Sequence, residues 1–228
     1  MGKRAESRQR IEAQIIELGR RHLVTEGAAG LSLRAIARDL GMVSSAVYRY
    51  VASRDELLTL LLVDAYSELA DCVDRARDDG APWHEQFRAM AHAARRWAVD
   101  QPASWALLYG TPVPGYRAPR ERTVGPGTRV VGALFDVIAA GIAVGDIPQS
   151  KAVVPEPLSS EFEALREEFS FSGDDGAVAK GFLSWATLIG AISLEVFGQY
   201  GPDTLTKPAD VFDLQIELVI HTLTMVKN

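Results

Sequence analysis

Four side chains between residues 44 and 49 carry groups that can bond to double-stranded DNA. Ser44 and Ser45 have hydroxyls that both donate and accept hydrogen bonds, and Tyr48 has a phenol. Arg49 has a guanidinium, which can donate two parallel hydrogen bonds to O6 and N7 of a guanine in the major groove. Such groups read a base sequence only when a rigid element presents them together, so the flanking residues must supply that element.

The flanking residues predict two short helices joined by a tight turn. Residues 33–40 place apolar side chains at helical spacing, which is typical of a helix with one buried face. Ser32 stands where a hydroxyl can accept from a free N–H of the first turn, and Gly41 stands where a left-handed residue ends a helix. Residues 44–50 predict a second helix, with two valines four residues apart on its buried side. This order is that of a helix-turn-helix, whose second helix enters the major groove.

The segment from Gly41 to Leu58 resembles a known signature. It reads Gly-x-x-x-x-x-Val-Tyr-x-Tyr-x-x-Ser-Arg-x-Glu-Leu-Leu and is similar to the DNA-binding signature of the TetR family of transcriptional regulators. The resemblance extends over about the first sixty residues, and the remainder resembles the family in helical character and length. Val43 replaces a residue that is often small and polar in the family, so Ser44 or Ser45 must begin the second helix. Val51 replaces the usual phenylalanine, which leaves a thinner core under that helix.

The resemblance implies how the start of the chain would contact DNA. Tyr48 and Tyr50 match the family's tyrosine and its histidine or tyrosine, which implies phosphate contacts. Arg54 matches the family's lysine, which implies a charge-assisted phosphate contact beside the start of the next helix. Residues 1–8 are expected to be a mobile basic arm that could reach DNA, and an untethered terminus is the alternative. The residues expected to contact DNA are Lys3, Arg4, Ser32, Arg34, Ser44, Ser45, Tyr48, Arg49, Tyr50 and Arg54.

The distribution of charge supports a basic DNA-binding segment. The whole chain has a net charge of −6, which by itself argues against a nucleic-acid partner. Residues 1–54, however, contain ten Lys or Arg and five Asp or Glu, a net charge of +5 against −11 for the remainder. A basic segment joined to an acidic one is typical of a DNA-binding module attached to a second function.

The remainder of the chain predicts helices and two irregular stretches. Ser53 and Glu56 form an S-x-x-E capping box, which predicts a long linking helix over residues 54–77. Residues 110–127 are rich in Pro and Gly, and residues 146–160 contain three prolines, so both stretches are expected to be irregular. Further helices are expected at residues 83–97, 102–109, 128–145, 161–171, 176–200 and 208–226.

The fold class that follows is all-α. We expect a three-helix helix-turn-helix DNA-binding domain at residues 1–53, joined by the linking helix to a helical ligand-binding and dimerisation domain at residues 54–228. Residues 208–226 are apolar on nearly every side, and such a helix must be covered on every side. A second copy of the chain is the expected cover, and folding back of the irregular stretches is the alternative. The residues expected in the dimer interface are Trp185, Ile189, Ile192, Val196, Leu214, Leu218 and Met225.

Aromatic and methionine side chains concentrate between residues 66 and 135. At helical spacing such residues belong to a core more often than to a cavity. The polar tips of Trp and Tyr need partners when buried, however, and several together suggest an adaptable apolar cavity. The same region holds an inducer in TetR-like proteins, so the resemblance implies a hydrophobic or planar small-molecule effector, with residues 110–127 as an entrance or lid. The candidate ligand-binding residues are Tyr66, Met90, Trp97, Trp105, Tyr109 and Phe135.

Catalytic and metal chemistry find little support in the sequence. The four histidines are scattered, and neither an H-E-x-x-H motif nor paired cysteines accompany them. The chain also lacks G-x-S-x-G, G-x-G-x-x-G and P-loop motifs. We therefore expect no catalytic site, no metal and no cofactor.

The expected function is that of a ligand-responsive repressor, which binds a palindromic operator as a homodimer and is released by its effector. A cytoplasmic location is expected, because the single cysteine, Cys72, excludes an internal disulfide and the N-terminus lacks the apolar stretch of a signal peptide. The longest apolar run, residues 182–197, is too short and too polar to predict a membrane span. An activator of the same fold is one alternative. A helical small-molecule-binding protein or enzyme with a vestigial helix-turn-helix is another, although Tyr48, Arg54 and the basic excess are all retained.

Overall fold

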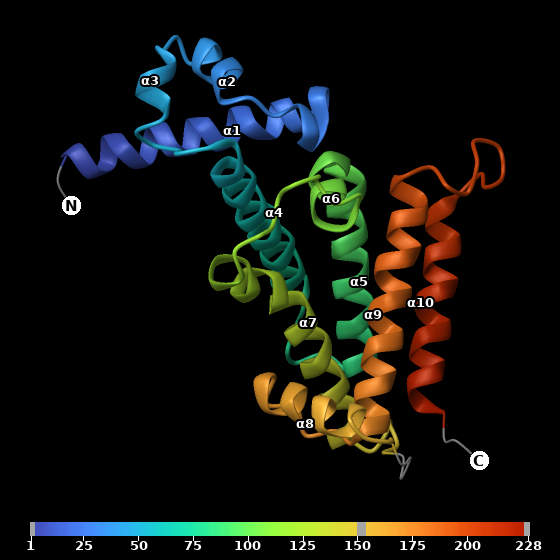
Figure 1. The fold of residues 1–228 in the computed structure, drawn as a ribbon. Helices are drawn as coiled ribbons and strands as arrows, with labels where there is room; N and C mark the ends of the chain where they lie inside the picture. The colour runs from blue at the N-terminus through green and yellow to red at the C-terminus, as the bar shows by residue number, and fades with distance from the viewer. Residues whose placement is uncertain (1–2, 150–153, 226–228) are drawn as a thin grey trace. The chain divides into compact units, whose positions relative to one another are not determined.

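Ten helices build the part of the chain that the structure describes. The computed structural model describes residues 3–149 and 154–225, and for residues 3 and 4 the backbone alone. No strand occurs within these ranges, which confirms the predicted all-α class. The helices are α1 (Lys3–Gly30), α2 (Leu33–Asp39), α3 (Ser44–Val47), α4 (Arg54–Ala76), α5 (Trp83–Asp100), α6 (Pro102–Tyr109), α7 (Arg120–Ala143), α8 (Leu158–Glu168), α9 (Asp175–Val196) and α10 (Pro208–Thr224) (Figure 1).

The contacts group the chain into two compact units. Unit 1 consists of Met1–Glu68 and Gln101–Gly127, and unit 2 consists of Leu69–Asp100 and Thr128–Asn228. Helices α1 to α3 and α6 therefore belong to unit 1, and α5, α8, α9 and α10 belong to unit 2, while α4 and α7 contribute to both. The predicted domain boundary lies at residue 53. The compact unit that holds the helix-turn-helix extends further, to residue 68, and also includes residues 101–127.

Unit 1 closes around aliphatic side chains from α1, α2 and α4. Its fully buried residues include Ile15, Ile36, Leu57, Leu58 and Leu61. Complete burial of a side chain of this size contributes about 1.5–3 kcal/mol. Partly buried side chains from the second segment, among them Leu107, Val113 and Tyr116, pack against the same core. Residues 101–127 therefore help to stabilise the helix-turn-helix.

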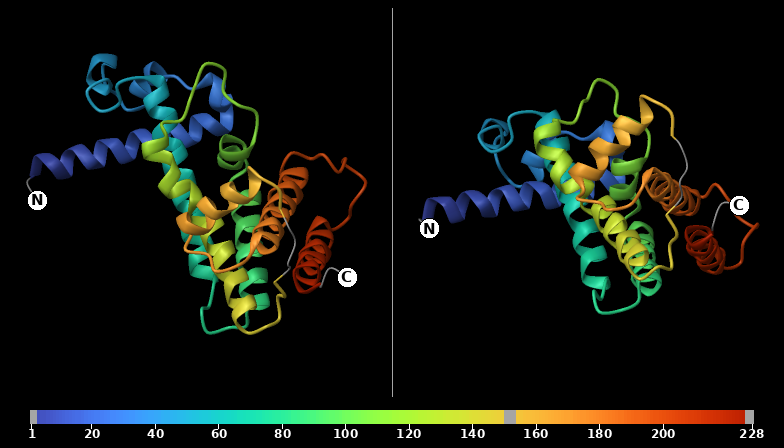
Figure 2. Two further views of the ribbon diagram at one scale, coloured as in Figure 1. Left: turned by 60° about the horizontal axis from the view of Figure 1, so that its bottom comes forward. Right: turned by 90° about the horizontal axis from the view of Figure 1, so that it is seen from below.

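Helix α1 begins earlier than the sequence predicts. The expected mobile arm is wrong for residues 3–8, which form the first turns of α1. Arg8 pairs with Glu12 one turn later at 2.7 Å, a spacing that supports an exposed helix. The regular part of α1 ends at Gly27, which has a φ of 67° and a ψ of 174°. Within unit 1, the N-terminal half of α1 extends beyond α2 and α3 (Figure 2).

Helix α7 begins inside a stretch that the sequence predicts to be irregular. The prediction that residues 110–127 are loop is wrong from Arg120 onward, because α7 starts there. Pro126 lies inside the helix, between Gly125 and Gly127. Proline removes one intrahelical hydrogen bond and costs about 3 kcal/mol in a helix interior, and each glycine costs about 1 kcal/mol. Residues 120–127 are therefore the weakest part of α7 by local propensity.

Unit 2 is built around α5, α9 and α10. Helices α9 and α10 run antiparallel and side by side, and both contact α5 (Figures 1 and 2). Arg95 on α5 pairs with both carboxylate oxygens of Glu195 on α9, at 2.5 and 2.7 Å. Arg88 pairs with Glu217 on α10 at 2.5 and 2.8 Å, and this partner holds the pKa of the Glu217 carboxyl below its usual range. These pairs fix the register of α5 against its two neighbours.

Helices α7 and α9 are long and apolar enough to cross a membrane, judged by length and composition alone. Both also contribute completely buried side chains to unit 2, among them Ile138 and Ile192. Core helices of globular proteins have the same length and composition, and these two helices pack in that manner.

Candidate functional site

The first helix of the helix-turn-helix starts and ends as predicted. The Ser32 hydroxyl accepts from the backbone N–H of Ala35 at 3.4 Å and caps the start of α2. Gly41 has a φ of 66°, and the N–H of Met42 after it donates to the Ala37 carbonyl at 2.9 Å. This arrangement is a Schellman motif, and its left-handed position costs a residue with a Cβ about 1–2 kcal/mol. Glycine therefore sets the sharp turn before α3.

The recognition helix α3 begins at Ser44, as the sequence predicts, and is shorter than predicted. Its N-cap is Val43, whose side chain makes no capping hydrogen bond. Regular helix ends at Val47, but the backbone continues in helical turns, since the N–H of Tyr50 and that of Val51 both donate to the Val47 carbonyl, at 2.9 and 3.1 Å. Val47 and Val51 are both completely buried. The expected inner face is confirmed, and it anchors these turns on unit 1.

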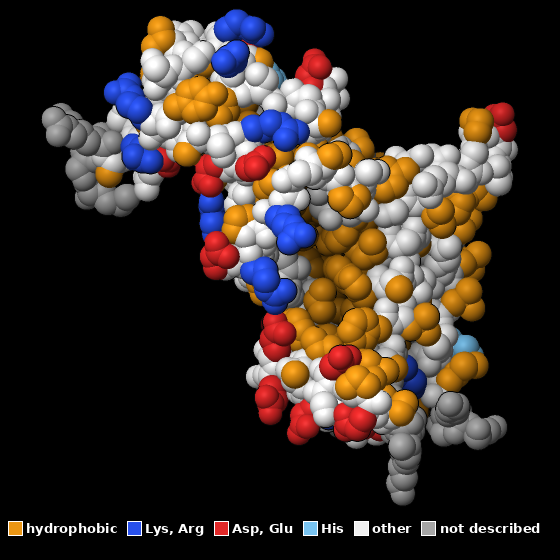
Figure 3. All heavy atoms as spheres, viewed as in Figure 1, with side chains coloured by type: hydrophobic (Ala, Val, Ile, Leu, Met, Phe, Trp, Pro, Cys, Tyr) orange, Lys and Arg blue, Asp and Glu red, His pale blue; other side chains and the backbone are white. Residues whose placement is uncertain are grey.

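Residues 44–50, which consist of α3 and the helical turn after it, form the recognition segment, and its outward face carries side chains predicted to meet DNA. Ser45, Tyr48 and Arg49 are exposed, and Ser44 is half-buried. Arg34 on α2 is also exposed, and arginine and lysine side chains are distributed over the surface of α1 to α3 (Figure 3). The orientation of these groups agrees with the sequence analysis. Their contacts with bases and phosphates remain predictions.

Tyr50 faces α1. Its ring is half-buried, and the guanidinium carbon of Arg8 lies 5.8 Å from the ring centroid, within the range of a cation–π contact. The first turns of α1 thus hold the end of the recognition segment. The side chains of Lys3 and Arg4, also expected to contact DNA, lie outside the described residues.

Arg54 has partners within unit 1 that the sequence did not indicate. Its Nη2 donates to the carbonyl oxygens of Ala28 and Ala29 at 2.9 and 3.0 Å, at the end of α1. Arginine side chains stabilise helix ends by bonding their last carbonyls. Arg54 therefore links the end of α1 to the start of α4 by hydrogen bonds. The phosphate contact expected for Arg54 remains a prediction.

Further side-chain hydrogen bonds hold α1 against α2 and α4 within unit 1. His22 on α1 bonds to the carboxylate of Asp39 on α2, with Nε2 and Oδ2 2.7 Å apart. Arg20 donates to Asp64 at 2.6 Å and to Glu68 at 2.7 Å, both on α4. Burial raises the pKa of the Asp64 carboxyl, although the Arg20 guanidinium acts in the opposite direction. Helix α1 thus connects the recognition elements rigidly to α4.

The two units also differ in charge, although by less than residues 1–54 and residues 55–228 do. Unit 1 contains thirteen Lys or Arg and ten Asp or Glu, a formal charge of +3, and unit 2 contains eleven and twenty, a formal charge of −9. Arg117, Arg120 and Arg122 in the second segment of unit 1 contribute to its basic balance. Acidic side chains gather over α8 in unit 2 (Figure 3).

Three of the candidate ligand-binding residues belong to unit 1. Trp105 is completely buried, and its ring centroid lies 4.4 Å from that of Tyr109 on the next turn of α6. Burial raises the pKa of the Tyr109 phenol, and the nearby Tyr66 on α4 acts in the same direction. Burial also raises the pKa of Tyr66. These phenols therefore remain protonated and polar at neutral pH.

The other three candidates belong to unit 2. Met90, Trp97 and Phe135 are 1%, 7% and 4% exposed. The Phe135 ring lies 5.3 Å from that of Phe169 and 4.8 Å from that of Phe171, measured between centroids. This phenylalanine cluster was not predicted from the sequence, where the close pair Phe169 and Phe171 was the available signal. Ligand binding by any of the six candidates remains a prediction.

The predicted dimer residues separate into three groups by exposure. Leu214, Leu218 and Met225 on or after α10 are 66%, 64% and 52% exposed. Ile192 is completely buried in the single chain because it faces the core of unit 2, so it cannot meet a partner and is removed from the interface. The remaining predicted residues, Trp185, Ile189 and Val196, are half-buried. Further exposed apolar side chains on and next to α9, outside the predicted set, are Phe182, Leu183, Leu194 and Phe197.

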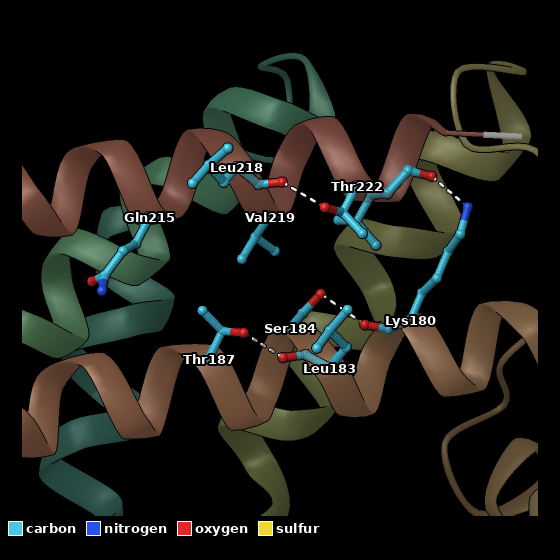
Figure 4. Close-up of a pocket in the computed structure, with 9 residues that line it drawn as sticks. Lys180, Leu183, Ser184, Thr187, Gln215, Leu218, Val219 and Thr222 are labelled. Carbon is cyan, nitrogen blue, oxygen red and sulfur yellow. Dashed lines mark hydrogen bonds between the residues drawn. The ribbon is translucent and has the colours of Figure 1, made fainter.

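A groove of about 210 Å³ runs between α9 and α10 (Figure 4). Thr187 and Ser184 point from α9 toward α10, and Gln215 and Val219 point from α10 toward α9. At one end Lys180 donates to the Leu223 carbonyl at 2.7 Å. The groove is therefore lined by polar side chains such as Thr187 and Gln215 together with the exposed leucines Leu183 and Leu218.

The described residues offer little for metal chemistry. No group of three or more His, Cys, Asp or Glu side chains among them could hold a metal ion. Cys72 lies next to Arg75, with Sγ and Nη2 3.3 Å apart. His92 on α5 lies 3.7 Å from Asp213 on α10 and edge-on to a phenylalanine ring.

A helix-turn-helix with an outward polar face, set in a basic helical unit and joined to an acidic helical unit, defines a DNA-binding transcriptional regulator. Residues 15–61 match the model described as bacterial regulatory proteins, tetR family, and residues 87–219 match the Tetracyclin repressor-like C-terminal domain. The chain belongs to the TetR family of transcriptional regulators.

Known relatives agree with this assignment. The chain is 66% identical over 225 residues to HTH-type transcriptional regulators of Mycobacterium tuberculosis and Mycobacterium bovis, covering 98% of this chain and 96% of theirs. The crystal structure of the regulatory protein SCO4313 has a TM-score of 0.78 and 31% identity, covering 96% of this chain and 100% of that one. The regulator FadR from Bacillus subtilis, solved in complex with stearoyl-CoA, has a TM-score of 0.65 at 12% identity, covering 91% and 97%, and shows a common fold.

Proposed function

We propose that the protein is a cytoplasmic, effector-responsive repressor that binds a near-palindromic operator as a homodimer. The observation that carries the proposal is the exposed polar face of the recognition segment, held on two completely buried valines. Ser44, Ser45 and Arg49 would read base edges from this face, and Tyr48 would contact phosphates. The match of residues 87–219 to a Tetracyclin repressor-like domain supports repression.

The proposed homodimer interface is the outer face of α9 and α10. Exposed leucines are concentrated there, and a large apolar surface of this kind on a soluble protein marks an interaction site. Gln215 supplies a second reason, because its Oε1 is buried in the groove without a hydrogen-bond partner among the described residues. A two-fold interface pairs the same face of both copies, which would place two recognition segments on related half-sites of one DNA duplex.

The proposed effector is a small molecule with a substantial apolar part. Its candidate contacts, the six aromatic and methionine residues, offer apolar surface with a few polar tips. A relative of the same fold is named as a complex with stearoyl-CoA, which supports an acyl thioester as the first effector to test. An effector would favour the DNA-free state only to the extent that it binds that state more tightly.

Selection of duplexes from a random pool tests the DNA part of the proposal. Sequences enriched by the purified protein are expected to contain two related half-sites about one helical turn apart, or a multiple of it. Binding should weaken steeply between 50 and 200 mM salt, because phosphate contacts release counterions. A protein that enriches no sequence and binds no duplex at 50 mM salt would refute the proposal.

Thermal unfolding tests the effector part. Stearoyl-CoA that binds the folded protein at a hundred times its Kd would stabilise it by about 2.7 kcal/mol, which is measurable as a raised melting temperature. Coenzyme A without the acyl chain is the matched control. The same compound should then release the selected duplex, and stabilisation without release would contradict the proposed regulation.

A further inference from the structure

Two side chains from the second segment of unit 1 are bound to one face of α4. The Tyr116 hydroxyl lies 2.9 Å from the Thr59 hydroxyl, and Arg122 donates from Nη1 to both carboxylate oxygens of Glu56 at 2.8 Å. Glu56 and Thr59 are three residues apart, so they are neighbours on the same side of the first turns of α4. The loop before α7 and the start of α7 are therefore fastened to the helix that follows the recognition segment.

The direction of the Tyr116 hydrogen bond follows from the partners of Thr59. Thr59 is 2% exposed, and its hydroxyl donates its single proton to the carbonyl of Asp55 at 2.9 Å. Tyr116 must therefore be the donor to Thr59. Burial raises the pKa of the Tyr116 phenol, which keeps it protonated for this role at neutral pH.

Arg122 also changes the capping of α4. The sequence predicts a capping box, in which the Ser53 hydroxyl accepts from the Glu56 N–H and the Glu56 carboxylate returns to the Ser53 N–H. The first bond is present at 3.0 Å. The carboxylate, however, is bound to Arg122, which lies 66 residues further along the chain. Arg122 thus neutralises the negative charge of Glu56 in the first turn of α4. Glu56 follows Tyr50, the last residue of the recognition segment, by six residues.

Residues 125–127, which have low helix propensity, join the start of α7 to the rest of that helix. The hydrogen bond that Pro126 cannot donate is the one that the carbonyl of Arg122 would accept. Gly125 and Gly127 flank the proline, and the division between unit 1 and unit 2 falls directly after Gly127. The segment that carries Arg122 therefore belongs to unit 1, while α7 beyond Gly127 belongs to unit 2, which contains three of the six candidate effector contacts.

We propose that Arg122 and Tyr116 are positioning residues for DNA binding. They form a latch that holds the first turns of α4 and keeps Glu56 neutralised next to the recognition segment, and residues 125–127 form the hinge through which the latch is released. A free Glu56 carboxylate would repel DNA phosphates, so the closed latch is the DNA-binding state. The inference rests on the proposed function, and its test separates the two.

The first test is a double-mutant cycle on affinity for a selected duplex. Arg122→Gln is expected to weaken binding about three- to fivefold, which is the upper range for a partly exposed ion pair. In a Glu56→Gln background the same change should have little further effect, because the charge to be neutralised is gone. Arg120→Gln, on an exposed arginine of the same turn, is the matched control and should act equally in both backgrounds.

A direct phosphate contact by Arg122 would give a different result. Arg122→Gln would then weaken binding equally with or without Glu56→Gln, and the salt dependence would fall by about one phosphate's worth. That outcome overturns the positioning role.

The second test does not depend on DNA. Hydrogen exchange of the free protein should show the first-turn amides of α4 exchanging about two- to fivefold faster in Arg122→Gln and in Tyr116→Phe than in the Arg120→Gln control. Gly125→Ala, whose Cβ would meet open space, should slow exchange in residues 122–127 by about fivefold. Unchanged α4 exchange refutes the latch even if the protein binds DNA. Faster exchange in a protein that binds no duplex supports the latch while the proposed function fails.

Discussion

Replacement of Arg54 by alanine distinguishes a tie within unit 1 from a contact with DNA. Arg54 donates to the carbonyls of Ala28 and Ala29, and a hydrogen bond to a charged group contributes about 1.5–3 kcal/mol. The full sum is not expected, because the Arg54 side chain is 34% exposed and the Ala29 carbonyl can be hydrated after the change. We therefore expect the free energy of unfolding to fall by about 1–2 kcal/mol.

Circular dichroism during thermal unfolding measures this loss. For a chain of this size each kcal/mol lowers the melting temperature by about 2–4 °C, so Arg54→Ala should melt about 2–8 °C below the wild type. Arg34→Ala removes an exposed arginine of α2 and should change the free energy of unfolding by no more than about 0.5 kcal/mol. Arg54→Lys keeps the charge but loses the planar fork, so it should recover only part of the loss.

The result that would refute this reasoning is an unchanged melting temperature for Arg54→Ala together with weaker DNA binding and a salt dependence reduced by about one phosphate. Arg54 would then act on DNA as the family resemblance implies. A lower melting temperature in the absence of DNA, with an unchanged salt dependence, establishes the structural role.

Four further outcomes are expected. Arg49→Ala should relax base preference at one operator position at a cost of about 1–3 kcal/mol, as measured by competition among duplex variants. Gly41→Ala should lower the free energy of unfolding by about 1–2 kcal/mol through backbone strain alone, since the added Cβ meets open space. Leu218→Asp should dissociate the dimer in sedimentation velocity, whereas Val144→Asp, at a 69% exposed valine on another part of unit 2, should not. The pKa of the Glu217 carboxyl is lowered in the folded protein, so this group contributes stability above pH 4.5 that is lost as the pH falls through the folded-state pKa. Glu217→Gln should therefore make acid unfolding less steep in this pH range.

Features set by neighbouring residues could be predicted from the sequence. The Ser32 cap, the left-handed Gly41 and the buried pair Val47 and Val51 each depend on side chains within one or two turns, and all three are present in the structure. The family signature added the direction in which α3 faces.

Features set by distant residues could not. Arg54 and Glu56 both find partners more than twenty residues away, and nothing at their own positions indicates those partners. The Pro and Gly content of residues 120–127 favours a loop, but packing of α7 overrides local propensity. Ile192 lies in the same apolar stripe as its neighbours, and the packing of α5, α8 and α10 against α9 decides which of its sides are buried.

The discontinuity of unit 1 has a consequence for the synthesis of the protein. The ribosome produces residues 1–68 first, but the unit is complete only after residue 127 has emerged. At about 5–20 residues per second, translation of the intervening 59 residues takes about 3–12 s. During this interval the nascent chain lacks the side chains of residues 101–127 that cover the aliphatic core, so it is exposed to chaperones and proteases. A messenger truncated before residue 127 would therefore yield a degraded fragment instead of a competing DNA-binding peptide.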